Sequence, residues 1–142
     1  MNCVILCGLP GSGKSTTARK LHQETGAVIV SSDAIRLMLT GGIYPSGDAY
    51  AVIEPAVWSL VESCLRTLLE QGQDVILDST ALTHALRQKW ASIAQEFGAT
   101  VDISWHDGQF DSPERWQRER GIGSEEYARI RAHLEQNVEK PS

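Results

Sequence analysis

The sequence predicts an α/β protein in which a mostly parallel sheet of about four strands lies between two layers of helices. Two observations predict this fold. Short apolar, β-branched runs alternate with helical segments along the 142 residues, and the links between them are short. Near-continuous apolar runs are typical of parallel strands covered on both faces, and right-handed helical crossovers join such strands. With 42% hydrophobic residues, the chain can form one domain over residues 1–142.

Four segments have the composition of strands. They are residues 2–7 (NCVILC), 27–31 (AVIVS), 74–78 (DVILD) and 100–106 (TVDISWH). In open parallel sheets, ligands bind at the carboxyl ends of the strands. The residues that follow each of these segments are therefore the ones in which we expect chemistry.

Helices are predicted between and after the strands, from apolar residues at three- and four-residue spacing and from capping residues. They cover residues 14–25, 51–71 and the segment from Thr83 to Gly98, and two more begin near Ser112 and Ser124. The predicted fold class is thus a three-layer α/β/α arrangement with a short helical region at the C-terminal end.

Composition and charge narrow the classes of function. No apolar run approaches the roughly 20 residues that cross a bilayer. No leader-like segment precedes the first strand, so we expect a cytoplasmic protein without a membrane partner. Cys3, Cys7 and Cys64 form no C-x-x-C pair, which indicates neither a disulfide framework nor a zinc site. The net charge of −5 disfavours a broadly positive nucleic-acid surface, although basic residues gather in residues 1–36.

The strongest motif is GLPGSGKST, residues 8–16, directly after the first predicted strand. It fits G-x-x-x-x-G-K-[ST], in which backbone N–H groups and a helix N-terminus hold a phosphate. Lys14 would neutralise β- and γ-phosphate oxygens, and the Ser15 hydroxyl suits Mg²⁺. The motif predicts a P-loop NTPase fold with ATP and Mg²⁺ as cofactors; the alternative is a Gly-rich turn with an incidental lysine. The predicted ATP-binding residues are Gly8, Pro10, Gly11, Ser12, Gly13, Lys14, Ser15 and Thr16.

The segment SSDAIR follows the second predicted strand. Asp33 lies at the strand end and Arg36 one helical turn later, so both side chains can face the phosphate motif. In phosphoryl transfer, a carboxylate that accepts the proton of the attacking hydroxyl is a recurring part. Asp33 fits this catalytic and substrate-binding role. Alternatively, or in addition, it caps the helix that begins here.

The third predicted strand ends in VILDST, an apolar run closed by an acid, which is the form of a Walker-B strand. Asp78 could orient a water on Mg²⁺, together with Ser15, or orient Arg36 or the acceptor. Alternatively, Asp78 and Ser79 cap the turn into the next helix. Thr80 faces either the cleft, as a substrate-binding residue, or this cap.

A short, highly charged segment, SPERWQRERG, carries Arg115, Arg118 and Arg120. A solvated helix face is the usual explanation for such a run. A P-loop transferase, however, needs positive charge against the transferring phosphoryl group. Arg120 is the first candidate for this catalytic and nucleotide-binding role, because Gly121 beside it would let a lid of about residues 111–123 move.

Residues 40–50 (TGGIYPSGDAY) are rich in Gly, Pro and Ser and are predicted as a loop. The loop directly follows the Asp33 segment, so Tyr44 and Tyr50 could stack against an acceptor. A plain connector between two helices is the alternative interpretation.

Taken in order, these motifs resemble the small P-loop kinases of the polynucleotide kinase type, which are related to the zeta toxins, over nearly the whole chain. The resemblance implies transfer of the γ-phosphate of ATP to the 5′-hydroxyl of DNA or RNA. It implies that Asp33 is the general base and that Arg36 binds the 3′-phosphate of the acceptor. It also implies that Lys14 and Ser15 bind ATP, that Asp78 is the acid at the third strand end, and that Arg120 is the lid arginine.

The leading hypothesis from the sequence is therefore an ATP- and Mg²⁺-dependent kinase that acts on a polynucleotide 5′-OH end. A small-molecule kinase for a nucleoside, sugar or antibiotic is one alternative, because related P-loop kinases share the acid at the second strand end. A nucleotide-binding ATPase module without an acceptor is another, although the guanine-reading N-K-x-D of GTPase switches is absent. No protein partner is predicted.

Overall fold

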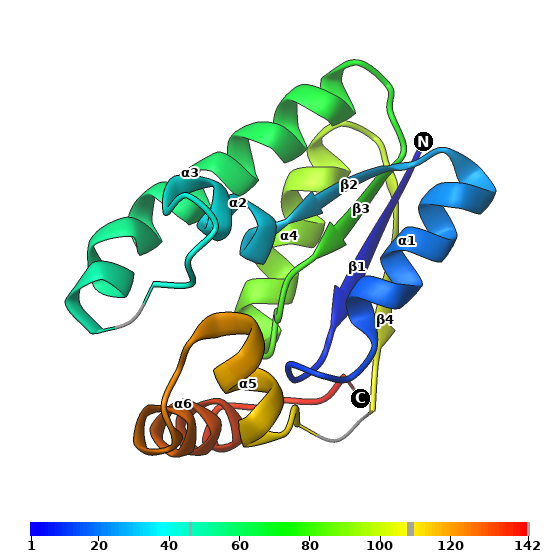
Figure 1. The fold of residues 1–142 in the computed structure, drawn as a ribbon. Coiled ribbons are helices and arrows are strands. Elements are labelled where there is room, and N and C mark those ends of the chain that lie inside the picture. Colours follow the sequence, from blue (N-terminus) through cyan, green and yellow to red (C-terminus); the bar gives the residue numbers. More distant parts are fainter. Residues whose placement is uncertain (46, 108–109, 142) are drawn as a thin grey trace.

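The computed structural model describes residues 1–45, 47–107 and 110–141, and these residues form the predicted α/β fold (Figure 1). The described part contains one four-stranded parallel sheet in the order β2-β3-β1-β4. The strands are β1 Asn2–Cys7, β2 Val28–Ser31, β3 Val75–Asp78 and β4 Thr100–Trp105. All four predicted strands are confirmed.

The register of the strands determines which residues meet at the carboxyl edge of the sheet. Strand β1 lies between β3 and β4, and Leu6 of β1 pairs with Asp78 of β3. On the other side of β3, Ser31 of β2 also pairs with Asp78. The segments that follow β1, β2 and β3 therefore leave the sheet at the same edge, where the sequence predicts the site.

Helices cover both faces of the sheet (Figure 1). Helix α1, Lys14–Thr25, packs on one face, where Ala18 lies against Leu6 and Ile76. Helices α3, Gly47–Glu70, and α4, His84–Glu96, pack on the other face. The three-layer arrangement predicted from the sequence is thus confirmed.

The remaining helices lie near the carboxyl edge. Helix α2, Ser32–Leu39, follows β2 directly. Helices α5, Pro113–Arg120, and α6, Ser124–Gln136, lie beyond the strand ends, with α6 crossing the lower end of the molecule in Figure 1. They therefore form a cover over the end of the sheet that carries the phosphate motif.

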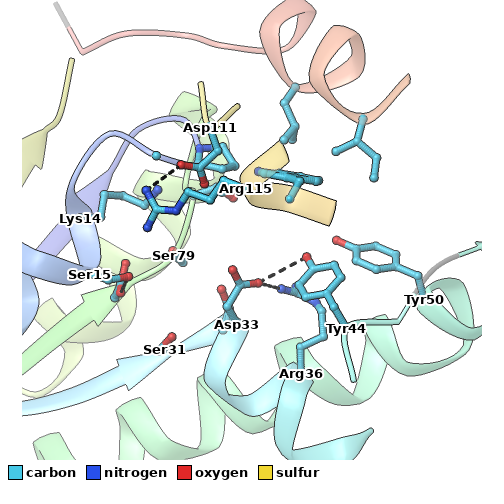
Figure 2. A pocket seen from close by; sticks show the side chains of 18 of the residues that line it. Lys14, Ser15, Ser31, Asp33, Arg36, Tyr44, Tyr50, Ser79, Asp111 and Arg115 are labelled. Carbon is cyan, nitrogen blue, oxygen red and sulfur yellow. Dashed lines mark hydrogen bonds and ion pairs between the residues drawn. The ribbon is translucent and has the colours of Figure 1, made fainter. Parts of the chain in front are cut away.

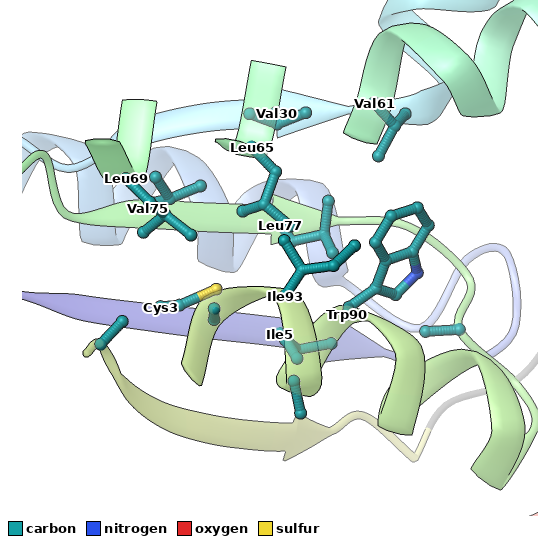
Figure 3. Close-up of a cluster of buried hydrophobic side chains, with 14 of the residues drawn as sticks. Cys3, Ile5, Val30, Val61, Leu65, Leu69, Val75, Leu77, Trp90 and Ile93 are labelled. Atoms are coloured by element: carbon teal, nitrogen blue, oxygen red, sulfur yellow. The ribbon is translucent and has the colours of Figure 1, made fainter. Parts of the chain in front are cut away.

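The main core lies between the sheet and the helices α3 and α4 (Figure 3). Leu65 of α3 and Trp90 of α4 meet Ile5 and Leu77 of the sheet, and each of these side chains is buried. Burial of each large apolar side chain contributes about 1.5–3 kcal/mol. This core holds β1 and β3 in position, and it thereby positions the residues that follow these strands.

Two local expectations are wrong. Ser31 caps α2, with its hydroxyl accepting from the Ala34 N–H at 3.2 Å, so Asp33 lies in the first helical turn. The loop predicted over residues 40–50 ends earlier, because α3 begins at Gly47 and includes Tyr50. The acidic Asp48 lies in its first turn, where a negative charge interacts favourably with the helix dipole.

No helix in the described parts of the chain is both long and apolar enough to span a membrane.

Candidate active site

The phosphate motif forms a tight loop between β1 and α1. Gly8 and Gly11 have φ values of 145° and 90°, which favour glycine. A Cβ on Gly8 would lie 2.6 Å from the backbone oxygen of His106, so the loop also needs glycine for space. The Gly8 N–H donates to the carbonyl of Thr80 at 3.1 Å. The loop after β3 therefore supports the start of the phosphate loop.

Lys14 is folded back onto this loop. Its ammonium donates to the carbonyls of Gly8 at 2.9 Å and Leu9 at 3.3 Å, and the residue is 9% exposed. Burial lowers the pKa of Lys14, while the nearby Asp78 and Asp33 carboxylates oppose that shift. An incoming phosphate would compensate this buried charge better than two carbonyl dipoles do.

Ser15 and Asp78 provide adjacent oxygen ligands. The Ser15 hydroxyl donates to Asp78 Oδ2 at 3.0 Å. Burial raises the pKa of Asp78, while the Ser15 hydrogen bond and the Lys14 charge oppose the rise. One hydroxyl and one carboxylate fit Mg²⁺, which takes only one or two protein ligands beside substrate phosphates and retains water. No group of three His, Cys, Asp or Glu side chains that could hold a metal occurs among the residues described.

Asp33 and Arg36 lie side by side on α2, facing the cavity (Figure 2). An ion pair joins Arg36 Nη1 to Asp33 Oδ1. The Arg36 guanidinium also makes two hydrogen bonds to Glu54 of α3, from Nε at 2.9 Å and from Nη2 at 3.0 Å. Burial alone would lower the Arg36 pKa, but the hydrogen bonds to Glu54, together with the charge interactions with Tyr44, Tyr50 and Asp33, raise it. Glu54 therefore fixes the direction in which Arg36 points.

Arg120, the last residue of α5, reaches Asp33 of α2. Its Nη2 lies 3.3 Å from Asp33 Oδ2, and its guanidinium lies over the rings of Trp116 at 4.2 Å and Tyr44 at 5.1 Å. Arg120 Nη1 is buried without a hydrogen-bond partner in the described chain. The arginine is therefore held by two aromatic faces and by its ion pair with Asp33.

Asp111 joins helix α5 to the phosphate loop. Its N–H donates to the Pro10 carbonyl at 3.1 Å, and its Oδ1 would lie 2.5 Å from a Cβ on Gly11. The carboxylate lies 3.1 Å from Arg115 Nη1 and 3.9 Å from Arg120 Nη1. One buried carboxylate therefore contacts two of the three arginines of α5, beside the loop that would hold the phosphates.

A cavity of about 570 Å³ brings most of the predicted residues together. Its wall includes the predicted site residues Pro10, Gly11, Gly13, Lys14, Ser15, Thr16, Asp33, Arg36, Asp78 and Thr80. Figure 2 shows Lys14 and Ser15 on one side of it and Tyr44 and Tyr50 on another. The wall as described does not include Gly8, Ser12 or Arg120. Gly8 packs closely against the backbone of His106. Arg120 is connected to the cavity through its contact with Asp33.

Sequence reasoning missed two residues of this site. Glu54 lies three residues before Val57 and seven before Val61, in line with the buried stripe of α3. An acid in line with an apolar stripe indicates a buried partner, and this signal could have identified Glu54. Asp111 precedes the Ser112 cap of α5 and has no comparable signal, because its partners come from the phosphate loop and from the far end of the helix.

Together, the sheet order, the phosphate loop and the strand-end acids define a nucleotide-binding P-loop protein with the fold of P-loop kinases. Residues 3–138 match the AAA domain family AAA_33, so the chain belongs to this family. That match covers all six helices and most of β1.

Curated relatives resemble part of this chain in sequence. Uncharacterized proteins of Mycobacterium tuberculosis and Mycobacterium bovis are 32% identical over 118 residues, covering 68% of this chain and 23% of theirs. This chain thus spans about a quarter of their length.

A chain in the structure of the Pnkp1/Rnl/Hen1 RNA repair complex is 27% identical, with a TM-score of 0.73, over 95% of this chain and 43% of that one. A gluconokinase from Sinorhizobium meliloti shares the fold at 19% identity and a TM-score of 0.60, over 99% of this chain and 76% of that one.

Proposed function

We propose that this protein is an ATP- and Mg²⁺-dependent kinase that transfers the γ-phosphate of ATP to the 5′-hydroxyl of a polynucleotide. One observation carries the proposal: the Asp33 carboxylate and the phosphate-loop residues Lys14 and Ser15 face one cavity. The carboxylate is 46% exposed, so an acceptor hydroxyl can reach it. A proton acceptor opposite a phosphate loop is the arrangement that phosphoryl transfer to a hydroxyl requires.

In the proposed reaction, the oxygen of the acceptor hydroxyl attacks the γ-phosphorus. A bond forms between these two atoms, and the bond from the γ-phosphorus to the oxygen bridging it to the β-phosphate breaks. The proton of the hydroxyl passes to the Asp33 carboxylate, and ADP leaves with the electron pair of the broken bond. Lys14 and Arg120 neutralise charge on the phosphate oxygens, which is the main way in which proteins accelerate this reaction.

Ser15 and Asp78 would hold the magnesium ion, directly or through water, because their oxygens lie 3.0 Å apart beside the phosphate loop. Such an ion supplies positive charge to the β- and γ-phosphate oxygens. On the acceptor side of the cavity, two hydrogen bonds to Glu54 hold Arg36 in place.

Two observations support a polynucleotide as the acceptor. Arg36 supplies a guanidinium beside Asp33, and such a group would bind a phosphate adjacent to the reacting hydroxyl. The similarity of 27% identity to a chain of an RNA repair complex extends over nearly the whole of this chain. A small-molecule kinase is the second candidate, favoured by the net charge of −5.

The test is to follow label from γ-labelled ATP with Mg²⁺ in the presence of several acceptors. These are a 5′-hydroxyl oligonucleotide, a 3′-nucleoside monophosphate, and a panel of nucleosides, sugars and aminoglycosides. We expect label on the oligonucleotide and on the 3′-monophosphate, with both products lost in Arg36→Ala. Label on a small molecule alone would replace the polynucleotide proposal with the second candidate. Free labelled phosphate as the sole product would indicate an ATPase without an acceptor.

A further inference from the structure

Helix α6 forms a wall of the cavity that the sequence did not indicate. Five of its residues face the cavity, namely Glu126, Arg129, Ile130, His133 and Leu134. Figure 2 shows the α6 ribbon across the cavity from Tyr44 and Tyr50. The acceptor half of the cavity is therefore bounded by α2 and α3 on one side and by α6 on the other.

The α6 wall is partly apolar. Ile130 and Leu134 pack, together with Tyr44, against the cluster that Trp116 and Tyr127 form in the lid region. Tyr50 lies 6.4 Å from Tyr44 between ring centroids, and burial raises the Tyr50 pKa to about 12, so this ring stays uncharged. Aromatic rings beside aliphatic side chains give a slot suited to a flat, apolar group such as a nucleobase.

Two basic side chains adjoin this slot. Arg129 and His133 are four residues apart on α6, so they lie on the same face of the helix, and both are exposed. Within the described residues, Arg129 has no ion pair, and His133 contacts only Asn137, 3.5 Å away, through its ring. The one carboxylate of this wall, Glu126, accepts a hydrogen bond from the Gly47 N–H at 3.3 Å.

Three of the other basic groups that face the cavity already have partners or roles, while Arg19 of α1, which also lines it, has no ion pair among the residues described. Arg36 is paired with Glu54 and Asp33, and Arg115 with Asp111 and Glu119. Lys14 belongs to the phosphate loop. Arg129 and His133 are thus cationic or hydrogen-bond-donating groups that the chemistry at Asp33 leaves unused.

We propose that Arg129 and His133 bind a phosphodiester group of the acceptor strand beyond its first nucleotide, and that α6 thereby selects a polynucleotide over a mononucleotide. This inference rests on the proposed function. Side chains four residues apart on one helix face are close enough to contact one phosphate. A basic edge beside stacking surfaces is the combination that binds single-stranded nucleic acid.

The test compares two acceptors that differ only beyond the first nucleotide. Label transfer is measured for a 5′-hydroxyl oligonucleotide and for a 3′-nucleoside monophosphate, with wild type, Arg129→Ala and His133→Ala. We expect KM for the oligonucleotide to rise about tenfold in Arg129→Ala, while KM for the mononucleotide and both kcat values stay unchanged. The slope of oligonucleotide affinity against salt should fall by about 1, as expected for one lost phosphate contact.

Arg131→Ala is the matched control. Arg131 lies on the same helix but outside the cavity wall, where it pairs with Glu135 at 2.8 Å and lies over the Phe110 ring. The control removes the same charge, so it should leave oligonucleotide KM and the salt slope as in wild type. Equal rises in KM for both acceptors, or no rise in Arg129→Ala, would overturn the inference.

Oligonucleotide binding by fluorescence anisotropy in the presence of ADP separates this inference from the proposed function. If wild type labels neither acceptor but binds the oligonucleotide through Arg129, the proposed function is wrong and the phosphodiester site is retained. If wild type labels both acceptors and Arg129→Ala binds the oligonucleotide like wild type, the proposed function is retained and the phosphodiester site is wrong.

Discussion

Removal of the Glu54 carboxylate is expected to destabilise the fold and to displace Arg36. Arg36 is 4% exposed, and its two hydrogen bonds to Glu54 are 2.9 and 3.0 Å long. Loss of one partner from a buried ion pair costs about 3–5 kcal/mol, because the remaining charge is left without compensation. Asp33 still pairs with Arg36, so we expect Glu54→Ala to cost about 3 kcal/mol, near the lower end of that range.

The assay is urea unfolding followed by tryptophan fluorescence, since the chain contains four tryptophans. Glu62→Ala is the matched control on the same helix. Its partner Arg66 is 39% exposed, and such surface pairs contribute about 0–1 kcal/mol. A double variant, Arg36→Met with Glu54→Ala, measures the coupling between the two side chains.

If Glu54→Ala lowers the free energy of unfolding by less than about 1 kcal/mol, as little as Glu62→Ala does, the Glu54 carboxylate does not stabilise the buried Arg36. Additive effects in the double variant would refute this stabilising role as well, because they would mean that the two side chains contribute independently.

Three further predictions concern the phosphate loop and the lid. Asp111→Asn should lower kcat about tenfold and change the Kd for ADP less than about threefold, because the lid arginines lose their positioning carboxylate; equal changes in kcat and Kd would contradict this. Gly11→Ala should weaken ADP binding at least tenfold in a fluorescence titration, since its Cβ would lie 2.5 Å from Asp111 Oδ1 at a φ of 90°; wild-type affinity would contradict this. Burial lowers the Lys14 pKa, and only the charged amine attracts phosphate, so ADP affinity should fall as the pH rises through that lowered value; an unchanged pH profile in Lys14→Met would contradict this.

Most of the fold could be predicted from the sequence because local signals and the global arrangement agree. The apolar runs of the strands alternate with capped helices. Gly26 ends α1 and Thr83 caps the start of α4, as predicted. The sequence predicts too late a start for α3, because the Gly and Pro content of residues 40–50 indicates a continuous loop. Helix α3 also continues through Pro55, which local propensity alone disfavours.

The phosphate-binding half of the site could be predicted because its residues are adjacent in sequence and their spacing has a direct mechanical meaning. The contact of Asp33 with Arg120 joins residues 87 positions apart, and it depends on how helix α5 packs. Asp111 and the α6 residues Arg129 and His133 could not be predicted from the sequence either, because tertiary packing brings them to the cavity. Sequence periodicity describes one face of α6 without indicating what that face covers.

The role of Asp33 as general base is tested by single-turnover label transfer from γ-labelled ATP to a 5′-hydroxyl oligonucleotide by wild type and by Asp33→Asn, with ADP binding measured in parallel. If Asp33 accepts the proton of the attacking hydroxyl, the variant should transfer label about 10²–10⁴-fold more slowly and bind ADP like wild type. Label transfer at the wild-type rate in Asp33→Asn would contradict the account.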